Sequence, residues 1–127
     1  MIEHLTLESF NEKIMDIETK EFKNEKKVVL KFEASWCFPC KSYKPVFEKV
    51  SNELEGVNFY SVDVDDEMEI SDIFSIRSVP TTVIIGIDGK KNSFSGSMQQ
   101  VKLIELIDNI DPTLNKSRIY CFFYIFF

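Results

Sequence analysis

The hydrophobic residues of this chain follow two spacings, and each spacing predicts a different kind of element. Short runs rich in β-branched and aromatic residues predict strands at residues 2–5, 28–32, 57–64, 82–87 and 90–95. Hydrophobic residues three and four positions apart predict helices at residues 10–20, 41–54, 68–74 and 103–110. The expected order of elements along the chain is therefore β-α-β-α-β-α-β-β-α.

This order predicts an α/β fold built on one central mixed sheet. Helices between the first strands imply parallel neighbours, whereas the turn signal Asp88-Gly89 predicts an antiparallel hairpin near the end of the sheet. We expect helices on both faces of the sheet. The domain is predicted to span residues 1–111, followed by an apolar tail, residues 112–127, outside the fold.

Composition and charge narrow the possible functions. The chain has 127 residues, a formal net charge of −6 and a hydrophobic content of 44%, which suits a single globular domain. The negative charge and the lack of a basic run argue against nucleic acid as a partner. The first residues show neither a signal peptide nor a transit peptide, and three cysteines do not make a secreted disulfide framework. We therefore expect a cytoplasmic protein, and a monomer.

The tail ends in nine hydrophobic residues, 119–127. A helix that spans a bilayer needs about 20 such residues, so no spanning segment is expected here. An interfacial anchor, a strand that pairs with a partner and a non-native extension all remain open for this segment. We assign no function to it or to Cys121.

The residues with a clear chemical signature lie between the strand predicted at 28–32 and the following helix. They read Trp36-Cys37-Phe38-Pro39-Cys40-Lys41. A Cys-x-x-Cys motif at a strand-to-helix junction indicates redox chemistry, because the unpaired N–H groups at a helix start favour the nucleophilic thiolate. Cys37 would attack a disulfide and Cys40 would resolve the mixed disulfide. Zinc binding is disfavoured because it needs about four ligands, and only Cys121 and His4 remain as candidates.

Together with the element order, four sequence features resemble the thioredoxin family over roughly residues 1–111. They are residues 32–41, Phe-Glu-Ala-Ser-Trp-Cys-Phe-Pro-Cys-Lys; 62–65, Val-Asp-Val-Asp; 76–81, Ile-Arg-Ser-Val-Pro-Thr; and the late Gly96. The resemblance implies the thioredoxin fold and a protein-disulfide reductase that works through Cys37 and Cys40. It also implies protein disulfide substrates, electrons from a reductase such as the family's NADPH-dependent flavoenzyme, and no bound cofactor.

The resemblance also implies roles for individual residues. Cys37 corresponds to the exposed nucleophile, Cys40 to its buried resolving partner, and Pro80 to a cis-proline beside the disulfide. The apolar surface that docks substrate would comprise Trp36, Phe38, Pro39, Val79, Pro80 and Gly96.

Three positions depart from the family pattern. Lys31 stands where the family has a buried Asp that helps to move the proton of the resolving thiol, and Ser61 stands where a Lys often pairs with that Asp. Lys31 is therefore a modulating residue: its ammonium either lies under Cys40 and favours thiolates or extends to water. Phe38 replaces the usual Gly between the cysteines, which is expected to shift the reduction potential and to favour hydrophobic clients. Glu33 is expected to face solvent without a role.

The loss of the buried Asp leaves an alternative function open. The chain could be a binding module that keeps the fold with little or no redox turnover. The intact cysteine pair argues against it.

Overall fold

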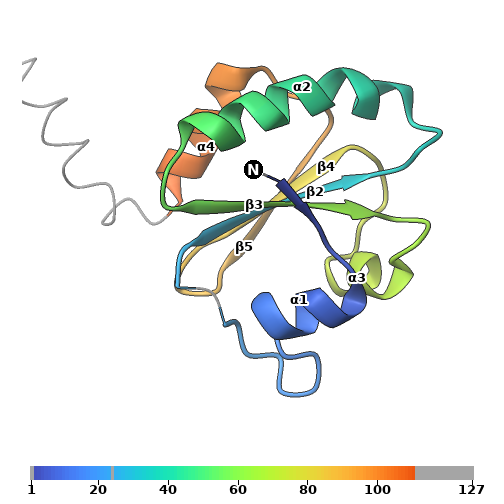
Figure 1. Ribbon diagram of the computed structural model, residues 1–127, viewed down its shortest axis with the longest axis vertical. Helices are drawn as coiled ribbons and strands as arrows, with labels where there is room; N and C mark the ends of the chain where they lie inside the picture. The colour runs from blue at the N-terminus through green and yellow to red at the C-terminus, as the bar shows by residue number, and fades with distance from the viewer. Residues whose placement is uncertain (1, 24, 111–127) are drawn as a thin grey trace, which may run out of the picture.

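A five-stranded mixed sheet with helices on both faces forms the protein (Figure 1). The computed structural model describes residues 2–23 and 25–110. The strands are β1 (Ile2–His4), β2 (Lys27–Glu33), β3 (Val57–Asp63), β4 (Thr81–Ile85) and β5 (Lys91–Ser95). The helices are α1 (Leu7–Lys13), α2 (Phe38–Glu53), α3 (Met68–Ile73) and α4 (Gln100–Asn109). The predicted fold class and element order are confirmed.

The strand order β1-β3-β2-β4-β5 places β2 at the centre of the sheet. β1 and β2 both pair with β3 in parallel, whereas β4 pairs antiparallel with β2 and with β5. The predicted hairpin joins β4 to β5: Gly89 has a φ of 85° and its N–H donates to the Gly86 carbonyl at 2.9 Å. Because β2 is central, the residues that follow it are held by neighbours on both sides.

Two hydrophobic clusters lie on opposite faces of this sheet. One packs under α1 and α3 and includes Leu30 of β2, and the other packs under α2 and α4 and includes Val29. In Figure 1, α2 and α4 lie above the sheet and α1 and α3 below it. Successive residues of a strand point to opposite faces, so Lys31 shares the α2 face with Val29.

The first helix is shorter than predicted, because α1 ends at Lys13 and not near residue 20. Side chains in its last turns and after it take over backbone hydrogen bonds: Asn11 Oδ1 accepts from the N–H of Ile17, and Asp16 Oδ1 accepts from that of Glu18. Such local bonds compete with a helix, so the spacing of Ile14 and Ile17 was misleading here. The helix begins at Leu7, three positions before the predicted residue 10, with Thr6 as the N-cap.

Helix α2 also differs from the prediction at both ends. It begins at Phe38, three positions earlier than residue 41, because Cys37 acts as its N-cap. It ends at Glu53, with Leu54 as the C-cap. Gly56 takes a φ of 76° in the turn between this helix and β3.

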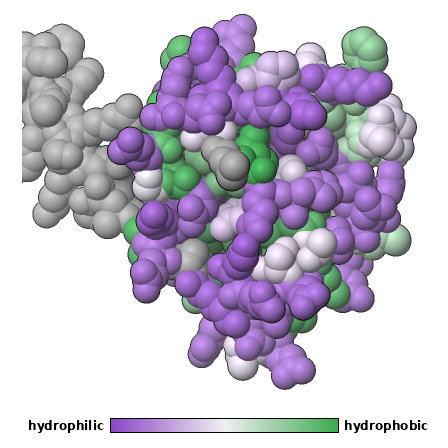
Figure 2. Space-filling view, viewed as in Figure 1, coloured by the Kyte–Doolittle hydropathy of each residue, from purple (hydrophilic) through white to green (hydrophobic). Residues whose placement is uncertain are grey.

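Hydrophilic residues cover most of the face in Figure 2, with hydrophobic side chains showing between them. Within residues 2–23 and 25–110, the helices are too short or too polar to cross a membrane. The predicted tail, with Cys121, lies outside the described residues, as does the predicted domain end at residue 111.

Candidate active site

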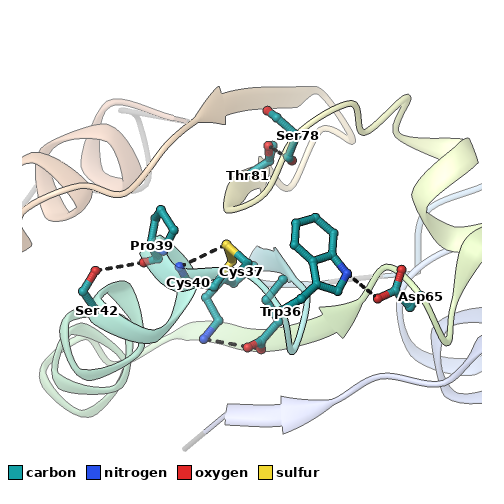
Figure 3. The surroundings of a disulfide bond; sticks show 10 residues. Trp36, Cys37, Pro39, Cys40, Ser42, Asp65, Ser78 and Thr81 are labelled. Atoms are coloured by element: carbon teal, nitrogen blue, oxygen red, sulfur yellow. Dashed lines mark hydrogen bonds and ion pairs between the residues drawn. A yellow bond between two sulfur atoms is a disulfide. The ribbon is translucent and has the colours of Figure 1, made fainter.

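The two cysteines of the motif lie at the N-terminus of α2 and form a disulfide (Figure 3). Their Cα atoms are 5.3 Å apart. Cys37 is the N-cap, and its Sγ accepts a hydrogen bond from the N–H of Cys40 at 3.2 Å. The N–H of Cys37 in turn donates to the carbonyl of Ala34 at 3.1 Å, which closes the turn after β2. The predicted strand-to-helix junction is confirmed.

The first turn of α2 suits an ionised sulfur. Pro39 lies in this turn, where its missing N–H costs little, and the Ser42 hydroxyl donates to the Pro39 carbonyl at 3.0 Å. The first N–H groups of a helix point outward without helical partners and carry the positive end of its dipole. A thiolate at Cys37 would accept the N–H of Cys40, so this geometry favours the anion over the thiol.

Both sulfur-bearing residues are buried in this oxidised form. Cys37 is only 4% exposed and Cys40 2%. The expectation of an exposed Cys37 is therefore wrong here, because Ala34, Val64 and Val79 pack against the cysteine pair. Cys40 is buried as expected.

Two large side chains stand out around the disulfide. Trp36 is 69% exposed and Phe38 80%. The indole Nε1 of Trp36 donates to Asp65 Oδ2 at 2.8 Å, which holds the ring beside the disulfide (Figure 3). Asp65 belongs to the Val-Asp-Val-Asp stretch at residues 62–65, and nothing in its spacing predicts this contact.

The loop before β4 carries Val79 and Pro80, two more residues of the predicted apolar docking surface. The Val79–Pro80 peptide bond is cis, as the resemblance implied. The N–H of Gly96 donates to the Pro80 carbonyl at 2.8 Å, so the end of β5 lies beside this loop. A pocket of about 150 Å³ is lined by Trp36, Val64, Ile76, Arg77, Ser78 and Val79. Arg77 and Ser78 were not singled out by their spacing in the sequence.

Beneath the cysteines, Lys31 is buried with only 2% of its side chain exposed. Its Nζ lies 3.4 Å from Glu33 Oε1 and 5.2 Å from the centroid of the Phe47 ring. Burial lowers the pKa of Lys31, and the nearby Glu33 carboxylate opposes that shift. The alternative in which the ammonium extends to water is wrong. The expectation for Glu33 is also wrong, since it is only 25% exposed and is the counterion of this lysine.

Lys31 belongs to a row of polar residues across the sheet. His4, Ser61, Lys31 and Thr82 are neighbours in register on β1, β3, β2 and β4. A hydrogen bond of 2.9 Å joins His4 Nδ1 to Ser61 Oγ. Thr82 Oγ1 lies 2.8 Å from the hydroxyl of Tyr43, which is three residues after Cys40. Burial raises the pKa of Tyr43 to about 12.

A larger polar pocket of about 450 Å³ opens beside this row. It is lined by Ile2, His4, Lys31, Glu33, Ala34, Ser35, Lys44, Glu48, Ser61 and Asp63. Within the described part of the chain, no three His, Cys, Asp or Glu side chains gather as a metal site would require. The Cys37–Cys40 pair at the start of α2 supports thiol–disulfide exchange.

Comparisons with known proteins agree with this geometry. The sequence model of the family Thioredoxin matches residues 1–109. A thioredoxin of Borreliella burgdorferi is 37% identical over 100 residues, covering 76% of this chain and 86% of the relative. A thioredoxin of Rickettsia bellii is 32% identical over 110 residues, and the match covers 86% of this chain and 98% of that protein.

Solved structures show the same fold. The crystal structure of Malassezia sympodialis thioredoxin superposes with a TM-score of 0.72 at 32% identity, covering 87% of this chain and 90% of that one. The structure of a chloroplastic thioredoxin z has a TM-score of 0.73 at 24% identity and covers 87% of this chain and 95% of its own, a likeness of fold alone. With the Cys37–Cys40 pair in place, the chain belongs to the thioredoxin family and is a thiol–disulfide oxidoreductase of the protein-disulfide reductase type.

Proposed function

We propose that Cys37 is the attacking thiolate and Cys40 the resolving thiol in the reduction of protein disulfides. The Cys37 thiolate attacks one sulfur of the substrate disulfide, and the other substrate sulfur leaves as a thiolate that takes up a proton. Cys40 then loses its proton and attacks the Cys37 sulfur, which releases the second substrate thiol and leaves the Cys37–Cys40 disulfide. The observation that carries this assignment is the N-cap position of Cys37, where the N–H of Cys40 donates to its sulfur.

In this proposal an extended substrate segment docks on the apolar rim. The rim comprises Trp36, Phe38, Pro39, Val79, Pro80 and Gly96. Its support is the exposure of Trp36 and Phe38 beside the buried disulfide, and the hydrogen bond that holds Gly96 against Pro80. The exposed phenyl ring of Phe38 adds apolar contact area, so clients with hydrophobic residues next to their disulfide would dock better.

The wider setting of the reaction belongs to the same proposal. The protein works as a monomer in the cytoplasm, and a thioredoxin-reductase-like donor returns the disulfide to the dithiol. The domain comprises residues 1–111 and the tail 112–127 lies outside it, which is supported by the family match that ends at residue 109. A chain ended after residue 111 should keep the reductase rate of the full chain, and a lost rate would give the tail a role.

The experiment that tests the reaction is reduction of insulin disulfides by dithiothreitol, followed by turbidity. Cys37→Ser should lower the rate to that of dithiothreitol alone, because serine cannot form the mixed disulfide. Cys40→Ser should instead accumulate a Cys37 mixed disulfide that mass spectrometry detects. The matched control is Cys121→Ser, the same change at the third cysteine, which should keep the full rate. Equal rates for wild type and Cys37→Ser would leave only the binding-module alternative.

Lys31 acts on this reaction as a modulating residue in the proposal. Its buried ammonium lies on the face of the sheet that α2 covers, the helix that carries Cys40. Lys31→Asp would replace a positive group with a negative one and should change the pH dependence of the resolving step between about pH 6 and about pH 9. An unchanged profile would contradict the role.

A further inference from the structure

The ion pair of Lys31 and Glu33 and the two cysteines have Ala34 as a common neighbour. Ala34 lines the 450 Å³ pocket together with Lys31 and Glu33. Ala34 also packs against both Cys37 and Cys40. Ala34 is therefore a neighbour that the charged pair and the cysteine pair share.

Other charged groups face the same pocket but are placed differently. Lys44 and Glu48 come from α2, His4 from β1 and Asp63 from β3. Lys44, Glu48 and His4 are exposed, and Asp63 is partly exposed, whereas Lys31 is buried. Water and salt screen exposed charges strongly and buried charges much less, so the Lys31 charge is the least screened of these groups.

We propose that Lys31 and Glu33 shift the reduction potential of the Cys37–Cys40 couple in opposite directions, so that the two effects largely cancel in the intact pair. The proposal rests on the proposed function. Its basis is that the reduced form carries a thiolate, whereas the disulfide is neutral. A positive charge at residue 31 favours the reduced form, and a negative charge at residue 33 favours the disulfide.

The equilibrium that measures this effect is exchange with glutathione. One oxidised glutathione takes two electrons from the dithiol, and the products are the Cys37–Cys40 disulfide and two glutathione thiols. The Cys37 thiolate breaks the glutathione disulfide first. The Cys40 thiol then loses its proton, and its thiolate displaces the second glutathione from Cys37. The two protons lost by the protein end on the two glutathione thiols.

The test compares Lys31→Met, Glu33→Gln and the double variant at equilibrium with glutathione. Lys31→Met should raise the equilibrium constant for disulfide formation by about threefold to tenfold. This is the size expected when a charge about one residue diameter from the sulfurs is removed at an intermediate effective dielectric constant. Glu33→Gln should lower it by a similar or smaller factor, because Lys31 is then unopposed. The double variant should lie close to wild type. The oxidised fraction is read from thiol labelling and from the fluorescence of Trp36, the single tryptophan of the chain.

Two matched controls come from the same pocket. Lys44→Met and Glu48→Gln repeat the chemical changes at exposed positions of α2. Solvent screening should hold each of these shifts below about twofold. Shifts from Lys44→Met and Glu48→Gln as large as those of the buried pair would overturn the proposal.

The pH dependence gives an independent readout. Without Glu33, Lys31 loses its proton at a lower pH than in wild type, because the carboxylate raises the lysine pKa. The shift caused by Glu33→Gln should therefore fade as the pH rises through the lowered pKa of Lys31 and this lysine becomes neutral. The alkylation rate of Cys37, measured over the same range, should show its pKa raised in Lys31→Met.

The sign pattern decides the outcome. Shifts of the same sign in Lys31→Met and Glu33→Gln, or no shift in either, would overturn the proposal, because a general loosening of the site moves both variants alike. Glu33 is partly exposed, so Glu33→Gln alone tests its sign even if Lys31→Met does not fold. Failure of the wild-type chain to exchange with glutathione at all would count against the proposed function and not against the role of the pair alone.

Discussion

The two faces of strand β2 bury different kinds of residues. One face is apolar and mainly stabilises the fold, and the other buries charged side chains on the side of the helix that carries the cysteines. On the face covered by α1 and α3, Val28, Leu30 and Phe32 are fully buried in an apolar cluster. On the face covered by α2 and α4, Lys27 and Lys31 are buried beside Val29. The stability of the apolar face comes from the hydrophobic area that folding removes from water. On the other face, each buried polar group needs its own hydrogen-bond or ion-pair partner.

Those partners are present on the α2 face. Lys27 Nζ donates to the carbonyl of Ile107 at 2.9 Å, Lys31 pairs with Glu33, and the hydroxyls of Tyr43 and Thr82 lie 2.8 Å apart. An arrangement of this kind adds little net stability, because the desolvation of polar groups offsets the bonds they form. It does place charges and dipoles next to the helix that carries the cysteines, which an apolar core cannot do.

The largest effect is expected on the apolar face. Leu30→Ala should lower the free energy of unfolding by about 3 kcal/mol, because it removes buried methyl groups and leaves a cavity. Urea denaturation of the oxidised protein measures it. The pH dependence of Cys37 alkylation should stay that of wild type, and a changed profile would show that the two faces are not separate.

A smaller loss is expected for the hydroxyl pair on the α2 face. Tyr43→Phe leaves the buried hydroxyl of Thr82 without this partner and should lower the free energy of unfolding by about 1–2 kcal/mol. The double variant Tyr43→Phe/Thr82→Val removes both hydroxyls and should recover part of that loss. A double variant less stable than Tyr43→Phe would contradict this account of the pair.

Alkaline pH should lower the stability of the fold through the same tyrosine, because its hydroxyl is buried. The pKa of Tyr43 is raised from 10.0 to about 12, so the fold disfavours its ionised form. The stability that this tyrosine contributes is therefore complete below pH 10 and is lost as the pH rises towards 12. At about pH 11 wild type should have lost about 1 kcal/mol that Tyr43→Phe does not lose. Denaturation of both proteins at neutral and alkaline pH, compared pairwise, cancels the other titrating groups. A constant difference between them would rule out the shift.

The smallest effect is expected for the charge pair itself. Lys31→Met should leave the free energy of unfolding at neutral pH within about 1 kcal/mol of wild type, or raise it, since burial of the ammonium offsets its attraction to Glu33. The pKa of Lys31 is lowered in the fold, so wild type gains stability from this group as the pH rises from that lowered pKa to 10.5. Lys31→Met should lack this gain. A loss of several kcal/mol on removing Lys31 would show that the pair is mainly structural.

Much of the fold and the dithiol could be predicted because the signals are local. The spacing of Val28, Val29 and Leu30 predicts a buried strand, and β2 forms there. The position of Cys37 before a proline and an amphipathic stripe predicts a helix start, and α2 begins at the next residue. Helix ends were less certain, since Asn11 and Asp16 compete for backbone N–H groups in a way that hydrophobic spacing does not record.

What the amino-acid sequence determined by itself is the order of the elements and the identity of the reactive sulfurs, because periodicity and the Cys-x-x-Cys spacing act over a few residues. The other site residues find their partners only in the folded chain. Asp65 is 29 residues from Trp36, and the row from His4 to Thr82 exists only through the register of four strands. Lys31 and Glu33 are two residues apart, yet their ion pair depends on α2 covering that face and excluding water from the lysine. A side chain's charge is written in the sequence, whereas its solvation, and hence its effect on a nearby sulfur, is set by what packs around it.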